Sequence, residues 1–197
     1  MDAYLLDWVN LLLRWAHVIT AIAWIGSSFY FVLLDNSLSR PEHDDLKAKG
    51  VDGEMWAVHG GGFYHANKYM LAPRSRALPD NLHWSCWESY STWLTGFALF
   101  TVLYLFNAGS FLVDKSVLDW SPAAAIAASL GILVAFWFVY DAICRAFGQR
   151  DKGDLIVGAG VTAFVVFASW LACQLFAGRA AFLLVGAAVA SSACFIT

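Results

Sequence analysis

Long apolar segments constrain the fold of this chain more than any other feature. They occupy about residues 8–34, 84–106, 122–147, 155–176 and 180–197. Each of the first four exceeds the roughly 20 residues that a helix needs to span a bilayer. Composition agrees, with 60% hydrophobic and 14% charged residues, against about 45–50% and 25% in a soluble domain. Hydrocarbon offers no partners to backbone polar groups. We therefore predict an all-α integral membrane protein with about five transmembrane helices.

The fifth apolar segment is shorter than the others, with residues 180–197 ending in "VASSACFIT". No polar flank follows it. We interpret the chain as part of a longer protein with a truncated fifth helix. The alternative is a short fifth helix that ends at the far membrane interface.

Basic residues are concentrated in two connecting segments that the helix count places on one side of the membrane. Nine of the chain's 12 basic residues lie there. They are Arg40, Lys47, Lys49, Lys68, Arg74, Arg76, Arg145, Arg150 and Lys152. Because cytoplasmic loops carry an excess of Lys and Arg, these segments are predicted to be cytoplasmic and the N-terminus to lie outside.

The long connection of residues 35–83 contains the stretch "GEMWAVHGGGFYHANKYM". Aromatic residues flank three glycines there, which is typical of a β-hairpin. With a turn at Gly60, Gly61 and Gly62, His59 would face Phe63, and His65 would face Ala57. His59 and His65 would then share one face, roughly 7–8 Å apart. The Gly-rich backbone, the two imidazoles and Lys68 could together hold a small anion. A metal site lacks a complete ligand set here.

A stripe of polar, small and aromatic residues runs along the first apolar segment at helical spacing. It consists of Asn10, Arg14, His17, Ala21, Trp24 and Ser28. His17 follows Trp8 by nine residues, or about 14 Å along a helix, which places it inside the hydrocarbon layer. Intramembrane ionisable residues are functional by default, and imidazole ligates haem iron. His17 is therefore a candidate haem ligand, with Arg14 and Trp24 as cofactor-binding neighbours. The alternative is a histidine that only hydrogen-bonds a carbonyl or another helix.

Glu88 lies near the start of the second apolar segment, on one helix face with Ser91 and Thr95. A carboxylate there could bind a substrate N–H group or relay protons. It could equally be a glutamate favoured by the dipole of a helix N-terminus. We take Glu88, His59 and His65 as candidate catalytic residues. Lys68 and His83 are the candidate substrate-binding residues. Asp141 and Arg145, at i,i+4 spacing, are predicted to form a structural ion pair.

The sequence gives little support to nucleic-acid binding or to covalent attachment of a haem. The net charge is −3, and no basic stripe indicates nucleic-acid binding. The four cysteines form no CxxC or CxxCH motif, so we interpret them as small apolar residues inside or beside the helices.

Several stretches together resemble the membrane-embedded N-terminal domain of the bacterial PuuD-type urate oxidases, or urate hydroxylases. They are "DWVNLLLRWAHVITAIAWIGSSFYFVLLDNSL", "GEMWAVHGGGFYHANKY", "LHWSCWESYSTWLTGFALF", "VYDAICR" and "GRAAFLLVGA". They cover almost the whole chain in the expected order. The motif "HVxxAxAWIGSSF" alone also resembles other bacterial haem-linked membrane proteins, including protoporphyrinogen-oxidase-like and copper-resistance-type proteins.

The resemblance implies a membrane-bound enzyme of purine degradation that oxidises urate to 5-hydroxyisourate. It implies haem as cofactor, a cytochrome c as electron acceptor and the inner membrane of a bacterium as the location. Full-length relatives carry further helices and usually a C-terminal cytochrome c domain, which residues 1–197 do not contain. The chain departs from the family pattern at Leu184, where a histidine often precedes "VGA". If that histidine is a second haem ligand in relatives, this chain lacks it.

Urate is a planar monoanion at neutral pH, so its site should offer a cation, N–H acceptors and a flat apolar wall. Lys68, His59, His65, Glu88 and nearby aromatic residues meet that description. Two other functions stay open. Arg14, His17 and Glu88 could form a proton or ion path in a transporter. The chain could also be a non-catalytic membrane anchor for a cytochrome subunit.

Overall fold

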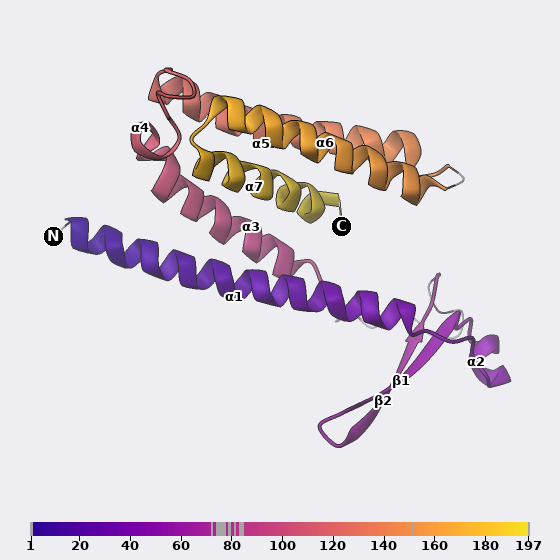
Figure 1. The fold of residues 1–197 in the computed structure, drawn as a ribbon. Helices are drawn as coiled ribbons and strands as arrows, with labels where there is room; N and C mark the ends of the chain where they lie inside the picture. The colour runs from indigo at the N-terminus through magenta and orange to yellow at the C-terminus, as the bar shows by residue number, and fades with distance from the viewer. Residues whose placement is uncertain are drawn as a thin grey trace. The chain divides into compact units, whose positions relative to one another are not determined.

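The computed structural model describes residues 2–71, 73, 78, 80, 82, 85–150 and 152–196. The chain divides into two compact units. The first combines Met1–Ala21 with Cys86–Thr197, and the second is Ile22–Ser85. In chain order the elements are α1 (Asp2–Asn36), α2 (Asp44–Ala48), β1 (Gly53–His59), β2 (Gly62–Lys68), α3 (Trp87–Phe100), η1 (Thr101–Leu105), α4 (Ala108–Phe111), α5 (Pro122–Phe147), α6 (Gly153–Leu175) and α7 (Gly178–Ile196) (Figure 1).

Three long helices form the centre of the first unit. Helices α5, α6 and α7 pack against one another, and α3 packs on α7 (Figure 1). Between α3 and α7, the Trp93 Nε1 atom donates a hydrogen bond to Ser191 Oγ at 3.1 Å. Helix α5 begins where the sequence favours a start, because Pro122 is its first residue and the Ser121 hydroxyl accepts from Ala124 N.

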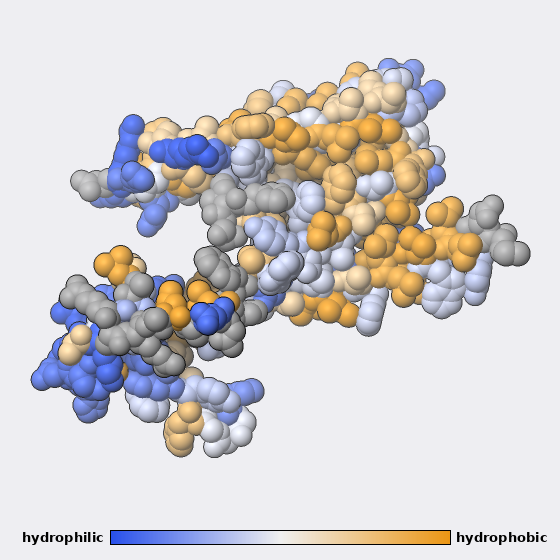
Figure 2. All heavy atoms as spheres, turned by 180° about the vertical axis from the view of Figure 1, so that it is seen from behind, coloured by the Kyte–Doolittle hydropathy of each residue, from blue (hydrophilic) through white to orange (hydrophobic). Residues whose placement is uncertain are grey.

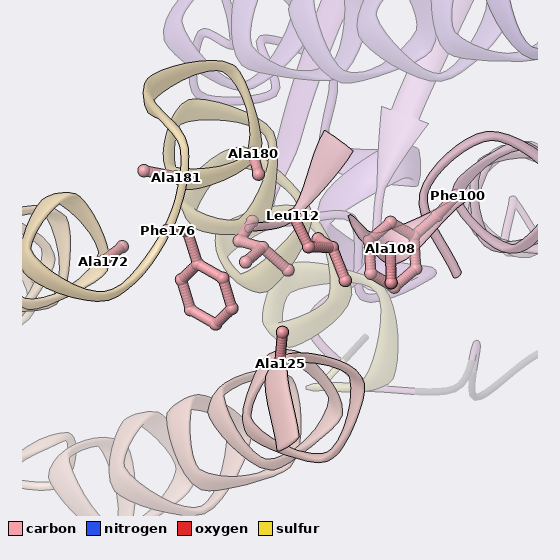
Figure 3. Close-up of a cluster of buried hydrophobic side chains, with 9 residues drawn as sticks. Phe100, Ala108, Leu112, Ala125, Ala172, Phe176, Ala180 and Ala181 are labelled. Carbon is pink, nitrogen blue, oxygen red and sulfur yellow. The ribbon is translucent and has the colours of Figure 1, made fainter. Parts of the chain in front are cut away.

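Small residues allow the close packing at one end of this bundle. Figure 3 shows the Phe176 ring lying among alanines of α5 and α7, with Leu112 beside it. The buried cluster consists of Phe100, Ala108, Leu112, Ala125, Ala172, Phe176, Ala180, Ala181 and Leu184. The Ala177 N–H donates to the Leu112 carbonyl at 3.0 Å, which joins the α6–α7 turn to the end of α4. Leu184 is fully buried in this cluster.

The structure has a helix in each of the five predicted apolar segments, with bounds that differ from the predicted ones, since α1 begins at Asp2 and not at about residue 8. Three helices are long and apolar enough to cross a membrane, namely Tyr4–Asn36, Pro122–Phe147 and Gly153–Leu175. Gly178–Cys194 is a shorter apolar helix. Within the predicted span over residues 84–106, α3 extends to Phe100 and is followed directly by the π-helical turn η1. The fold is mostly helical, and three candidate spans are established among the described residues.

The second unit contains the end of α1, the short helix α2 and the β-hairpin of β1 and β2. Ser39 pairs with Glu54 as an isolated antiparallel bridge, so the segment after α1 adds to the edge of β1. The Lys68 ammonium lies 2.7 Å from the Asp35 carboxylate and joins the base of β2 to the end of α1.

The hairpin turns on two glycines. Gly60 and Gly61 have φ angles of +59° and +79°, as a two-residue type I′ turn requires. Gly62 is already in β2 and pairs with His59. The register therefore sets Val58 opposite Phe63 and Trp56 opposite His65.

This register corrects the prediction. A three-glycine turn would have set His59 opposite Phe63 and put His59 and His65 on one face. That prediction is wrong, because a shift of one residue in register moves side chains to the opposite face. In the structure Trp56, Val58, Phe63 and His65 share one face, while His59 and Lys68 lie on the other.

The two units differ in their surfaces. In Figure 2, hydrophobic side chains gather over the helices, whereas hydrophilic side chains gather around α2 and the hairpin. At the end of α5 the predicted ion pair is confirmed, with Arg145 Nε 2.8 Å from Asp141 Oδ2.

Candidate functional site

His17 joins α1 to α3 within the first unit. Its Nδ1 atom lies 3.2 Å from the Thr92 carbonyl oxygen and 3.2 Å from Thr95 Oγ1. Thr20, one turn further along α1, lies 3.2 Å from the same Thr95 hydroxyl. One histidine and three threonines thus form a polar network between two apolar helices.

The network assigns the proton of the His17 ring. A carbonyl oxygen only accepts hydrogen bonds, so Nδ1 must donate to Thr92. The Thr95 hydroxyl donates to the Ser91 carbonyl at 2.7 Å, which leaves its oxygen free to accept from Nδ1. In the neutral ring Nε2 then carries the lone pair. Metal-ligating histidines show this arrangement, with the non-ligating nitrogen donating to a carbonyl or a carboxylate.

Gly96 lets the His17 ring lie directly on α3. A Cβ atom at position 96 would lie 2.8 Å from His17 Cε1 and 3.2 Å from Nδ1, which is closer than real Cβ contacts. The two threonines and the glycine together fix the plane of the imidazole.

The residues around His17 fit a histidine that would hold a haem. Nδ1 is anchored, Nε2 is an available donor atom, and the ring is only partly buried. Of the other histidines, His43, His59 and His65 belong to the second unit, and His83 lies outside the described residues. Leu184 is a fully buried aliphatic side chain and offers no donor atom.

The face of α1 differs in part from the predicted stripe. Half-buried positions recur at spacings of three and four residues, namely Asn10, Leu13, His17, Thr20, Trp24 and Ser27. Arg14 and Ser28, which the prediction placed on this face, are exposed. Arg14 Nε donates to Asn10 Oδ1 at 2.7 Å along the helix surface. The cofactor-binding roles of Arg14 and Trp24 stay predictions.

Glu88 lies in the first turn of α3, as predicted. Its backbone carbonyl accepts from Thr92 Oγ1 at 2.8 Å, so Glu88 lies one turn before the network around His17. Of the predicted face of Glu88, Ser91 and Thr95, Thr95 is the residue that contacts His17. His83, a candidate substrate-binding residue, lies outside the described residues.

A second cluster of functional side chains lies on the hairpin. His65 Nε2 lies 2.6 Å from Glu54 Oε2, and the Glu42 N–H donates to Glu54 Oε1 at 2.8 Å. The Glu54 side chain is only 6% exposed and that of His65 is 24% exposed. The Glu42 N–H and His65 hold the pKa of the Glu54 carboxyl below its ordinary value, His43 adds to this, and burial opposes it.

Trp56 covers one face of the His65 ring. The two rings are stacked with centroids 4.1 Å apart and an interplanar angle of 5°. Trp56 itself is 65% exposed. A buried carboxylate, an oriented imidazole and an accessible indole therefore meet on one face of the hairpin.

The other predicted hairpin residues lie apart from this cluster. His59 is exposed at the turn end of the opposite face. Lys68 lies on that same face and is paired with Asp35. The structure thus does not bring His59, His65 and Lys68 together as one anion site. Their catalytic and substrate-binding roles stay predictions.

Glu54, Trp56, Thr20 and Gly96 were not predicted as site residues. The sequence did indicate Glu54 and Trp56, because Gly-Gly dipeptides favour two-residue hairpin turns. That register places Glu54 and Trp56 on the face of His65. Thr20 follows His17 by three residues and extends the same face of α1. For Gly96, nothing in the sequence indicated which residue of α1 it contacts.

Comparisons with known proteins extend over nearly the whole chain. A family model described as the urate oxidase N-terminal domain matches residues 3–194. No curated protein and no solved structure matches the chain. The match includes α1 with His17, the hairpin with Glu54 and His65, and α3 with Glu88. The chain belongs to the urate oxidase N-terminal family.

Proposed function

We propose that this chain is the membrane domain of a urate oxidase that converts urate to 5-hydroxyisourate in purine degradation. His17 would hold a haem, which would supply the redox centre between urate and a cytochrome c. The family match over residues 3–194 supports urate as the substrate. Three helices able to cross a bilayer support the membrane location.

The hydrogen bonding of His17 is the observation that carries the haem proposal. An intramembrane histidine could satisfy both ring nitrogens within the protein. Here Nδ1 makes the hydrogen bonds to Thr92 and Thr95 of α3, and Nε2 makes none with the described residues. Donation from Nδ1 to the Thr92 carbonyl fixes the tautomer in which the neutral ring has its lone pair on Nε2, the atom that would bind a metal.

The haem would supply a one-electron centre inside the bilayer. Thr92 and Thr95 hold the tautomer and orientation of His17, and Gly96 provides the close approach. Glu88, one turn before Thr92, is the candidate residue for moving a proton toward this network. Basic residues in the segment 35–83 support a cytoplasmic entry for urate and an external N-terminus.

The proposal is tested with membranes that contain the natural full-length protein. We expect them to consume urate, to release 5-hydroxyisourate, and to show a haem absorbance. His17→Ala should abolish the absorbance of the haem held by this domain and the urate consumption. His43→Ala, at an exposed position directly before α2, is the matched histidine control and should leave both unchanged.

Two results would contradict the proposal. Wild-type membranes that leave urate intact would exclude the oxidase. A folded His17→Ala protein with the wild-type haem spectrum would exclude His17 as the ligand. Proton-coupled uptake into vesicles without any redox change would instead identify a transporter.

A further inference from the structure

We propose that His65 takes a proton from urate and that Glu54 is the residue that positions it. This inference rests on the proposed function, because it names the proton acceptor for that substrate. It concerns the hairpin cluster of Glu54, Trp56 and His65, all in the second unit.

The hydrogen bonds of the cluster orient the His65 ring as a base. The pKa of Glu54 is lowered, so at neutral pH its carboxylate accepts and His65 Nε2 donates. In the neutral ring Nδ1 then carries the lone pair. Among the described residues, the His65 ring hydrogen-bonds to Glu54 alone. The nitrogen that could accept a proton is therefore left to a ligand or to water.

A purely structural role explains this arrangement less well. The segment after α1 is already held to β1 by backbone bonds, with Ser39 N donating to Glu54 O at 3.0 Å and Glu54 N donating to Ser39 O at 2.9 Å. Glu42 N–H adds a third bond, to the Glu54 side chain. These three bonds hold the segment after α1 to β1 without the imidazole of His65. Burying a carboxylate is costly unless it is paired, and here the partner is a titratable ring with an open edge.

Trp56 adds the flat wall that a planar heterocycle needs. It stacks in parallel on His65 and fixes the plane of the imidazole. Its indole is 65% exposed and offers more area than the imidazole covers. Aromatic stacking tolerates purine-like rings because every such ring has a π face. An aromatic face also stabilises a cation such as the imidazolium.

The proton transfer from urate to His65 needs no other reactant. An N–H bond of the urate monoanion breaks, and its electron pair stays on urate, which becomes the dianion. The proton bonds to His65 Nδ1, and the resulting imidazolium faces the Glu54 carboxylate across 2.6 Å. The dianion loses electrons more readily than the monoanion, because it is the more electron-rich species.

Kinetics of the natural full-length protein test this role. His65→Gln should lower kcat by about 10²-fold or more, with a smaller effect on KM. Its rate should recover as the pH rises toward the second ionisation of urate. Glu54→Gln should lower kcat less and alter the pH profile. Ala57→Ser, on the opposite face, should behave as wild type. Wild-type kcat and pH profiles in both cluster variants would overturn the inference.

A binding measurement keeps the inference separate from the proposed function. In wild-type protein labelled at its histidine rings, urate should shift the NMR signals of His65 and leave those of His59 in place. If urate shifts His65 in a protein that never consumes urate, the proposed function fails and the contact stands. If urate is consumed and the His65 signals stay unchanged at saturation, the inference is overturned.

Discussion

At the scale of single residues, Gly96 decides how closely α3 approaches the ring of His17. Gly96→Ala would place a methyl group 2.8 Å from His17 Cε1. We expect the variant to lose about 1–3 kcal/mol of stability and to displace the ring from Thr92 and Thr95. Thermal unfolding in detergent and the haem absorbance would measure the two effects.

Gly131→Ala is the matched control for this substitution. A Cβ at position 131 of α5 meets nothing within 4 Å, and alanine favours a helix over glycine by roughly 0.5–1 kcal/mol. The control should be neutral or slightly stabilised. Equal stability changes in both variants would show that the His17 ring does not lie on Gly96.

Glu54 gives the hairpin unit a dependence on pH. Its folded-state pKa is lowered from the ordinary value of 4.5. The ionised carboxylate therefore stabilises the fold above about pH 4.5, and this contribution disappears as the pH falls through the lowered folded-state pKa. The protection of residues 53–68 from hydrogen exchange, measured relative to their intrinsic exchange rates, should fall in that acidic range. Glu54→Gln should remove this part of the pH dependence, and an unchanged profile in the variant would contradict the assignment.

At the scale of elements, the two-glycine turn sets the face on which each hairpin side chain lies. Gly61 has a φ of +79°, a conformation that a β-branched residue rarely adopts. Gly61→Val should loosen the hairpin and disturb the stacking of Trp56 on His65, which hydrogen exchange and the His65 ring signals would detect.

Gly60→Asn provides the comparison at the same turn, because Asn-Gly is a favoured pair for type I′ turns. The hairpin should keep its protection from exchange in this variant. Full protection in Gly61→Val as well would contradict the two-residue turn.

Helix packing at one end of the bundle depends on Phe176. Its side chain is fully buried, whereas Phe182 on α7 is 87% exposed. Phe176→Ala should cost about 3–5 kcal/mol because it leaves a cavity among small neighbours. Phe182→Ala should change stability by less than about 0.5 kcal/mol. Thermal unfolding would distinguish them, and equal losses would contradict the packing of Figure 3.

At the scale of the whole molecule, the sequence predicted most of the helices because long apolar segments allow little else in a bilayer. Helices α5 and α6 begin and end within two residues of the apolar segments, whereas α1 begins at Asp2, before the apolar segment starts. The change from α-helix to the π-helical turn η1 after Phe100 was not predicted, since nothing in residues 101–105 departs from an apolar helix.

The candidate site was predictable only where it follows from one helix. Helical spacing alone predicts the polar face of α1 that contains His17 and the face of α3 that contains Thr95. Their contact through Gly96 depends on how two helices meet, which no local pattern encodes. The hairpin cluster depends on a register that differs by one residue from the predicted one. Because of that difference, Glu54 and Trp56 share a face with His65, whereas His59, the predicted neighbour, lies on the other face.

The transfer of electrons from urate to the haem of this domain is the central claim for the whole molecule. It is tested most directly by following the haem absorbance of purified full-length protein without oxygen while urate is added. The account predicts that urate reduces the haem in wild-type protein and that His17→Ala shows no such change. A wild-type haem that a chemical reductant reduces, but that urate leaves oxidised, would contradict the account.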